Sequence, residues 1–192
     1  MREKKIFPYV LIAPNALIFL IFIIVPACFG FYFSLTEWKG IGTPEFVGFA
    51  NYIKLFSDAK FWRSFTRTCI HVAISLPLIM AVPLLLASLM VKEIKARGFF
   101  RAAFYWPSMI SYIVVGISFK FIFGDNTGII NYLLSFFNGL RIEWMTNQIT
   151  AMFVLVLATV WCRSGFYMVT YISGLQSVPL SYYEAAKVDG AS

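Results

Sequence analysis

Two long stretches without a charged residue restrict the fold more than any other feature of this sequence. Residues 9–33 (YVLIAPNALIFLIFIIVPACFGFYF) and residues 69–91 (CIHVAISLPLIMAVPLLLASLMV) are 25 and 23 residues long. A helix of about 20 residues crosses the hydrocarbon core of a bilayer. Since 60% of the 192 residues are hydrophobic, a water-soluble core could not bury all of this apolar surface. Both stretches therefore predict membrane-spanning helices.

Two further segments predict spans although each contains one cation. Residues 102–123 are interrupted only by Lys120, and residues 149–175 only by Arg163. Five prolines lie within the first three segments. They are acceptable there because neighbouring helices in a membrane bundle can satisfy the carbonyls that proline leaves free. The predicted fold is an all-α membrane protein: a polytopic bundle of four transmembrane helices that ends in a short cytoplasmic helix.

Lysine and arginine residues flank the spans unevenly and so predict their orientation. The N-terminal flank and the short loop after the second span carry Arg2, Lys4, Lys5, Lys92, Lys95, Arg97 and Arg101. Short loops rich in lysine and arginine face the cytoplasm. We therefore expect a multi-pass protein of the cell membrane, with the N-terminus and the C-terminal segment both cytoplasmic. The net charge of +7 follows from these topology signals and does not indicate nucleic-acid binding.

Arg163 lies near the middle of the fourth predicted span. An arginine at the centre of a membrane helix costs about 2.5–3.5 kcal/mol on insertion scales, so its side chain should face the bundle or a water-filled path. We interpret it as a residue of such a path. The alternative is an arginine that bonds backbone carbonyls, or one drawn to an aqueous boundary because the span has a different register.

Two side-chain patterns favour packing roles. His71 shares a helical face with Thr68 and Ser75, which favours a polar contact between helices over ligand binding. Between the first two spans, an i, i+3, i+4, i+7 stripe predicts a short amphipathic helix that lies on the membrane or packs on the spans. The stripe consists of Phe49, Tyr52, Ile53 and Phe56.

The C-terminal residues differ from the spans and predict a separate short helix over about 182–189. Ser181 and Glu184 have the spacing of a capping box, in which each side chain bonds the backbone N–H of the other residue. Pro179 prevents continuity with the fourth span, and Gly190 is suited to end the new helix. Two alanines would leave its surface smooth enough for another protein to approach closely. A surface helix without a partner is the alternative.

The same C-terminal segment, residues 176–192, resembles part of a known protein family. EAAKVDGA after the helix end SGLQSVP resembles the start of the EAA loop of permease subunits in binding-protein-dependent ABC importers. Other motifs are similar to the carbohydrate-type permeases, in particular the maltose- and glycerol-phosphate-type first subunit: LIAPNALIFLIFIIVP, FSLTEW, FVGFANYIKLF, FFRAAFYWPSMIS and GIINYLL. In that family the loop continues to an I-x-L-P pattern and two more helices. We therefore expect residues 1–192 to be a single transmembrane domain that is truncated at the C-terminus.

The resemblance implies a division of labour between chains. A separate ATP-binding cassette ATPase subunit would dock on the terminal helix, and Arg163 would line the translocation path. The docking residues would be Glu184, Ala185, Ala186, Asp189 and Gly190. The further partners would be a second permease subunit, in a heterodimer, and an extracytoplasmic solute-binding protein, and the substrate would be a sugar or related polyol.

The residues are compatible with a transport subunit that is not itself an enzyme. The sequence has no G-x-x-x-x-G-K-[ST] motif, so it offers no phosphate-binding loop for ATP. It contains one histidine and no nucleophile–base pair or metal-ligand cluster, and we expect neither a cofactor nor a metal. A secondary transporter or channel, and a membrane fragment that does not transport, are the alternatives. The spans contain no acidic residue for coupling to protons or sodium, which argues against the first of these.

Overall fold

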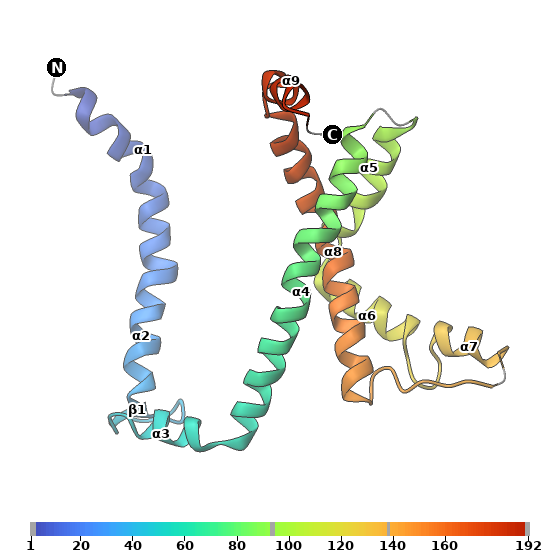
Figure 1. Cartoon of the computed structure of the whole chain (residues 1–192). Helices are drawn as coiled ribbons and strands as arrows, with labels where there is room; N and C mark the ends of the chain where they lie inside the picture. Colours follow the sequence, from blue (N-terminus) through green and yellow to red (C-terminus); the bar gives the residue numbers. More distant parts are fainter. Residues whose placement is uncertain (1–2, 93–94, 138, 191–192) are drawn as a thin grey trace. The chain divides into compact units, whose positions relative to one another are not determined.

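The computed structural model describes residues 3–92, 95–137 and 139–190, and most of these residues are helical (Figure 1). Arg2 of the N-terminal flank, and Ala191 and Ser192 of the terminal loop, lie outside these ranges. The helices are α1 (Glu3–Phe19), the π-helix η1 (Leu20–Ile24), α2 (Val25–Ser34), α3 (Ala50–Ser57), α4 (Ala59–Val91), α5 (Arg97–Tyr105), the 3-10 helix η2 (Trp106–Met109), α6 (Tyr112–Ile122), α7 (Ile129–Ser135), α8 (Gln148–Gln176) and α9 (Leu180–Val188).

The first of two compact units, Met1–Thr66, contains one long helical stretch. α1, η1 and α2 are continuous, and the stretch is long and apolar enough to cross a membrane. The Val25 N–H bonds the Leu20 carbonyl in the wider π-helical turn. Pro26 follows directly and has no N–H to continue the regular ladder, so the turn widens where that ladder is interrupted. The first predicted span lies within this stretch.

A small hairpin and a short helix complete this unit. β1 (Thr36–Glu37) and β2 (Glu45–Phe46) pair antiparallel. Asn51 of α3 donates from Nδ2 to the Ser34 carbonyl at 3.0 Å and to the Thr36 carbonyl at 2.9 Å, which ties α3 to the hairpin. The predicted amphipathic stripe lies along α3 and is exposed at three positions: Phe49, Ile53 and Phe56.

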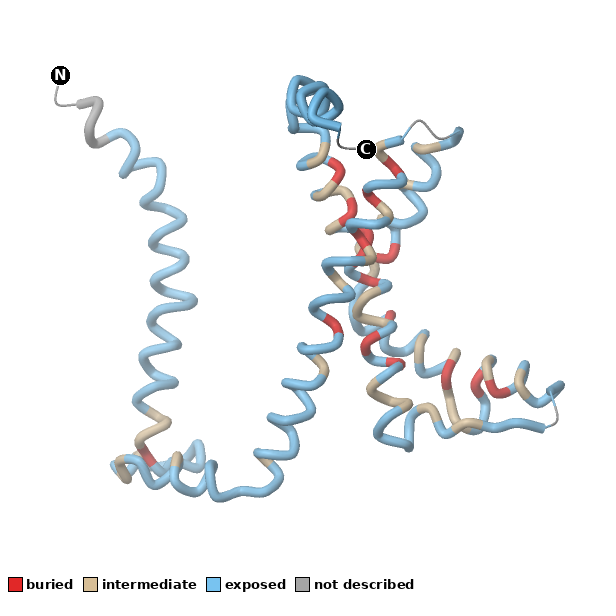
Figure 2. Tube along the Cα trace, in the orientation of Figure 1, coloured by how far each residue is buried: buried red, intermediate tan, exposed pale blue. Residues whose placement is uncertain are grey.

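The second unit, Arg67–Ser192, has its core where α4 and α8 cross, the region in which buried residues concentrate (Figures 1 and 2). Ala87 and Met90 of α4 pack there with Met168 and Ile172 of α8. Both helices are long and apolar enough to span a membrane, and they contain the second and fourth predicted spans. Their outward faces expose large apolar side chains, as expected where lipid is the solvent.

The third predicted span differs from the continuous helix that its apolar composition suggested. α5 with η2 and then α6 cover residues 97–122, and the two parts meet at an angle of 99°. Ile110 and Ser111 between them have extended ψ angles of 139° and 138°. The Ser111 hydroxyl then caps α6 by accepting from the Ile113 N–H. The helix therefore ends and restarts, as in a broken span or a re-entrant loop.

The terminal helix begins earlier than the capping box predicted, and the capping box is wrong. α9 starts at Leu180 with Pro179 as its N-cap, and no side chain makes a capping hydrogen bond. Ser181 therefore lies inside the helix, and Glu184 lies beyond the first turn. Pro179 has φ −58° and ψ 138°, the extended conformation that precedes a helix, so the proline itself sets the start. The predicted break after α8 is confirmed.

Candidate functional site

Gly165, near the centre of α8, lies where the backbone of another helix approaches very closely. A Cβ at this position would lie 2.1 Å from the carbonyl oxygen of Phe104 and 2.6 Å from Cα of Tyr105. These are backbone atoms at the end of α5, so no side-chain rotation could relieve the overlap. Only glycine fits at this crossing, as expected where helix backbones pack closely in a membrane.

Ser108 of η2 connects the two elements next to this glycine. Its hydroxyl donates to the Cys162 carbonyl at 2.8 Å and accepts from the Phe166 N–H at 3.1 Å. In a regular helix these two backbone groups would bond to each other. Cys162 also donates from Sγ to the Pro107 carbonyl at 3.5 Å. A side chain from η2 thus bridges the backbone ladder of α8 at mid-helix, which is a recognised cause of local bending.

Arg163 lies at this same point of α8 and is exposed. Its guanidinium carbon is 5.5 Å from the centre of the Tyr112 ring, at the start of α6, which is within the range of a cation–π contact. The bend between η2 and α6 brings Tyr112 to this position. The structure therefore gives Arg163 an aromatic neighbour. The sequence analysis had considered two other surroundings for its side chain, a water-filled path and backbone carbonyls.

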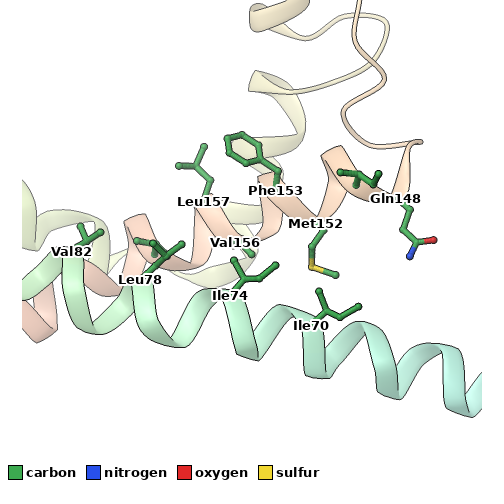
Figure 3. Close-up of a pocket in the computed structure, with 11 residues that line it drawn as sticks. Ile70, Ile74, Leu78, Val82, Gln148, Met152, Phe153, Val156 and Leu157 are labelled. Carbon is green, nitrogen blue, oxygen red and sulfur yellow. The ribbon is translucent and has the colours of Figure 1, made fainter.

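An apolar groove runs between α4 and α8 and has a volume of about 590 Å³ (Figure 3). Residues four apart on α4 line one side: Ile70, Ile74, Leu78 and Val82. The facing side is formed largely by aliphatic and aromatic residues of α8: Met152, Phe153, Val156 and Leu157. Since hydrated solutes lose hydrogen bonds in such surroundings, this groove suits acyl chains or another apolar helix and not a polar substrate.

A pocket of about 430 Å³ with several polar side chains in its lining lies between the start of α8 and the facing part of α4. Arg67 donates to the Gln148 side-chain oxygen at 3.0 Å there. His71 lines the pocket, and its Nδ1 is a buried nitrogen that has no hydrogen-bond partner in the described part of the chain. The sequence placed Thr68 beside His71, and both line this pocket, whereas Ser75 is buried. Sequence reasoning missed Arg67 and Gln148, because their pairing joins two distant helices.

The segment between α6 and α8 is held by two side chains that the sequence reasoning also missed. The Asp125 carboxylate accepts from the Thr146 hydroxyl, the Met145 N–H (2.8 Å) and the Thr146 N–H (3.1 Å). These donors, the Thr146 hydroxyl first among them, hold the pKa of Asp125 below its ordinary value of 3.8 because they favour the charged form. The second of these side chains is Asn131 of α7, which is 3% exposed and forms hydrogen bonds with Ile142 and Trp144. The only sequence signal was a polar residue within the apolar run IINYLL.

The predicted docking residues lie together on α9 and at its end. Glu184, Ala185, Ala186, Asp189 and Gly190 are all exposed. Gly190 has φ +81°, which confirms it as the residue that ends the helix, and its N–H bonds the Lys187 carbonyl at 3.2 Å. Since Glu184 forms no cap, its carboxylate remains available at the surface. α9 is a second candidate site, distinct from the α8 crossing that holds Arg163.

The fold and these two sites define a class of protein. Three long apolar helices and one bent helical pair make the chain a multi-pass helical membrane protein, which confirms the predicted all-α membrane fold. Its two candidate sites combine a close helix crossing, an exposed arginine and an exposed terminal helix.

Comparison with known proteins gives the family. The chain is 35% identical to the probable starch degradation products transport system permease protein AmyD of Thermoanaerobacterium thermosulfurigenes, over 99% of this chain and 64% of that protein. It is 33% identical to the probable ABC transporter permease protein YurN of Bacillus subtilis, over 100% of this chain and 67% of that protein. The chain belongs to the ABC transporter permease family. No protein-family model matches the sequence.

A solved structure shares the fold. A chain in the crystal structure of a bacterial alginate ABC transporter, in complex with an alginate pentasaccharide-bound periplasmic protein, superposes with a TM-score of 0.82. The match is 24% identical and covers 99% of this chain and 64% of that one. The present chain thus spans about two thirds of the length of the relatives that it matches.

Proposed function

We propose that this chain serves in a membrane-spanning permease subunit of an ATP-driven importer for sugars or related polyols. The observation that carries the proposal is sequence similarity over the whole chain to permeases of this family, one of them named for the transport of starch degradation products. The chain supplies membrane helices, a close crossing and an exposed arginine. ATP hydrolysis would take place on a partner chain.

α9 is the element through which the ATPase subunit would act. Its alanines present little bulk, its carboxylates are exposed and its end is shaped by the positive φ of Gly190. Small side chains let a helix enter a cleft, and a carboxylate on its surface can meet a cationic group of the partner. Movement of this docked helix would pass directly into α8, since only residues 177–179 separate the two.

The proposal also includes a second permease subunit, a solute-binding protein and a role for Arg163, all of which the family resemblance implies. Residues 1–192 belong to one transmembrane domain, which pairs with a second permease subunit, and a solute-binding protein delivers the substrate from outside. The crystal complex of the alginate transporter with its periplasmic protein supports this last partner by analogy. Arg163 lines the path at mid-span, where its charge and the Tyr112 ring offer contacts to a hydroxyl-rich solute.

The test changes the shape of α9 in a permease expressed together with its ATPase subunit. Ala186→Leu adds bulk to a close contact, and Gly190→Val places a β-branched residue at φ +81°. Both variants should reach the membrane but lose the ATPase during purification in detergent, with loss of uptake. Ala186→Ser and Gly190→Asn are the matched controls, because serine stays small and asparagine tolerates positive φ. Full ATPase retention and uptake in both disruptive variants would leave α9 as a surface helix and refute the coupling role.

A further inference from the structure

The short helix α7 carries an apolar stripe that faces away from the rest of its unit. Ile129, Tyr132, Leu133 and Phe136 recur at i, i+3, i+4 and i+7, and they are 54%, 66%, 51% and 68% exposed. Phe137, 70% exposed, extends the stripe. Five neighbouring apolar side chains without a charge between them form a surface that water solvates poorly.

Asn131 fixes which way this stripe points. It is 3% exposed, on the opposite side of the helix, and donates to the Asp125 and Ile142 carbonyls at 2.9 and 2.8 Å. Its side-chain oxygen accepts from the Ile142 N–H and from Trp144 Nε1, both at 3.1 Å. Rotating α7 to bury the stripe would break these four hydrogen bonds inside the protein. The stripe is therefore held outward.

The same segment follows α6 directly, and α7 lies beside the end of α6 (Figure 1). Asp125 follows α6 after a few residues and binds Met145 and Thr146, which directly precede α8. The six residues 123–128 between α6 and α7 reach at most about 20 Å when fully extended. α7 is thus tethered to the end of α6 and to the residues that lead into α8, two helices that expose large apolar side chains.

We propose that α7 is an interfacial helix whose stripe inserts among the phospholipids at this end of α8. The composition fits a bilayer surface, because aromatic side chains such as tyrosine and phenylalanine favour that depth and no charge interrupts the stripe. A cation is suitably placed beside it. Arg141 lines a cavity of about 590 Å³ together with Tyr132 and Ser135, and it can pair with a headgroup phosphate.

The test measures the surroundings of single nitroxide labels in bilayer nanodiscs of phosphatidylethanolamine and phosphatidylglycerol. The labelled chain carries Cys28→Ser and Cys69→Ser, which remove the exposed thiols, and keeps the buried Cys162. One variant adds Phe136→Cys in the stripe. The matched control adds Ser135→Cys, an exposed neighbour on the same helix outside the stripe. Power-saturation EPR then compares collisions with oxygen, which concentrates in lipid, and with a water-soluble nickel chelate.

The ratio of oxygen to nickel accessibility should be severalfold higher at position 136 than at position 135. Equal ratios at both positions would overturn the proposal, because α7 would then lie in water. Exclusion of both reagents from position 136 would also overturn it, since the stripe would then be covered by protein. Either failure would leave the proposed transport function untouched, because that proposal does not depend on where α7 lies.

Discussion

Replacing Gly165 with alanine tests the packing argument most directly. The added Cβ would lie 2.1 Å from the Phe104 carbonyl oxygen, about 1.3 Å closer than the 3.4 Å at which ordinary contact begins. The nearest atoms belong to the backbone of α5, so α5 and α8 would have to separate. Any separation would also stretch the two hydrogen bonds of Ser108, which join η2 to Cys162 and Phe166 on either side of Gly165.

The expected size of the effect combines two opposing contributions. Overpacking a tight core costs about 1–3 kcal/mol, and an overlap with immobile backbone should fall at the upper end of this range. In the opposite direction, alanine stabilises a helix interior by up to about 1 kcal/mol relative to glycine. Gly165→Ala should therefore lower the free energy of unfolding by about 2 kcal/mol.

Gly174→Ala is the matched control, because Gly174 lies on the same helix and nothing is within 4 Å of its added Cβ. That variant should unfold at equal or slightly higher denaturant. The assay is reversible unfolding of the purified chain in mixed micelles by increasing SDS, followed by circular dichroism. If Gly165→Ala proves as stable as Gly174→Ala, then α5 and α8 do not approach as closely as the structure indicates, and the reasoning fails.

Two further predictions concern charged side chains. Because the pKa of Asp125 is lowered in the folded chain, its contribution to stability should be complete above the unfolded pKa near 3.8 and should be lost as the pH falls through the lower folded value. Hydrogen exchange at the Met145 and Thr146 amides, normalised for intrinsic rates, should therefore be faster in Asp125→Asn at pH 7, and equal protection in both proteins would contradict this. Arg163→Leu should insert normally but impair uptake, whereas Arg163→Lys, which keeps the charge, should retain part of it; normal uptake by the leucine variant would exclude a role in the path.

Features that depend only on neighbouring residues could be predicted from the sequence. The apolar runs predicted α1–α2, α4 and α8 because the length and hydropathy of a segment decide whether it can cross a bilayer. Pro179 predicted the break after α8, and Gly190 predicted the end of the terminal helix, for similarly local reasons of backbone geometry. Membership of the ABC transporter permease family was also predicted from sequence motifs and is confirmed by the relatives.

Local signals failed where two of them competed. Ser181 and Glu184 have capping-box spacing, but Pro179 already occupies the N-cap, and only one residue can begin a helix. In the third span the apolar composition suggested continuity, whereas the extended backbone at Ile110 and the cap at Ser111 end and restart the helix. At α9 the geometry of the proline decides between the signals.

The tertiary structure alone decided the contacts between distant residues. Ser108 meets α8 across 54 and 58 positions of sequence, and Asp125 meets Met145 and Thr146 across 20 and 21. Nothing in the sequence distinguishes Gly165 from the other glycines, because its importance depends on the backbone of α5 that packs against it. Such pairings have no periodicity or spacing to read, because they depend on which faces of two helices come together. The sequence by itself therefore determined that the chain spans a membrane and to which family it belongs, whereas folding determined where its helices cross and which side chains are held there.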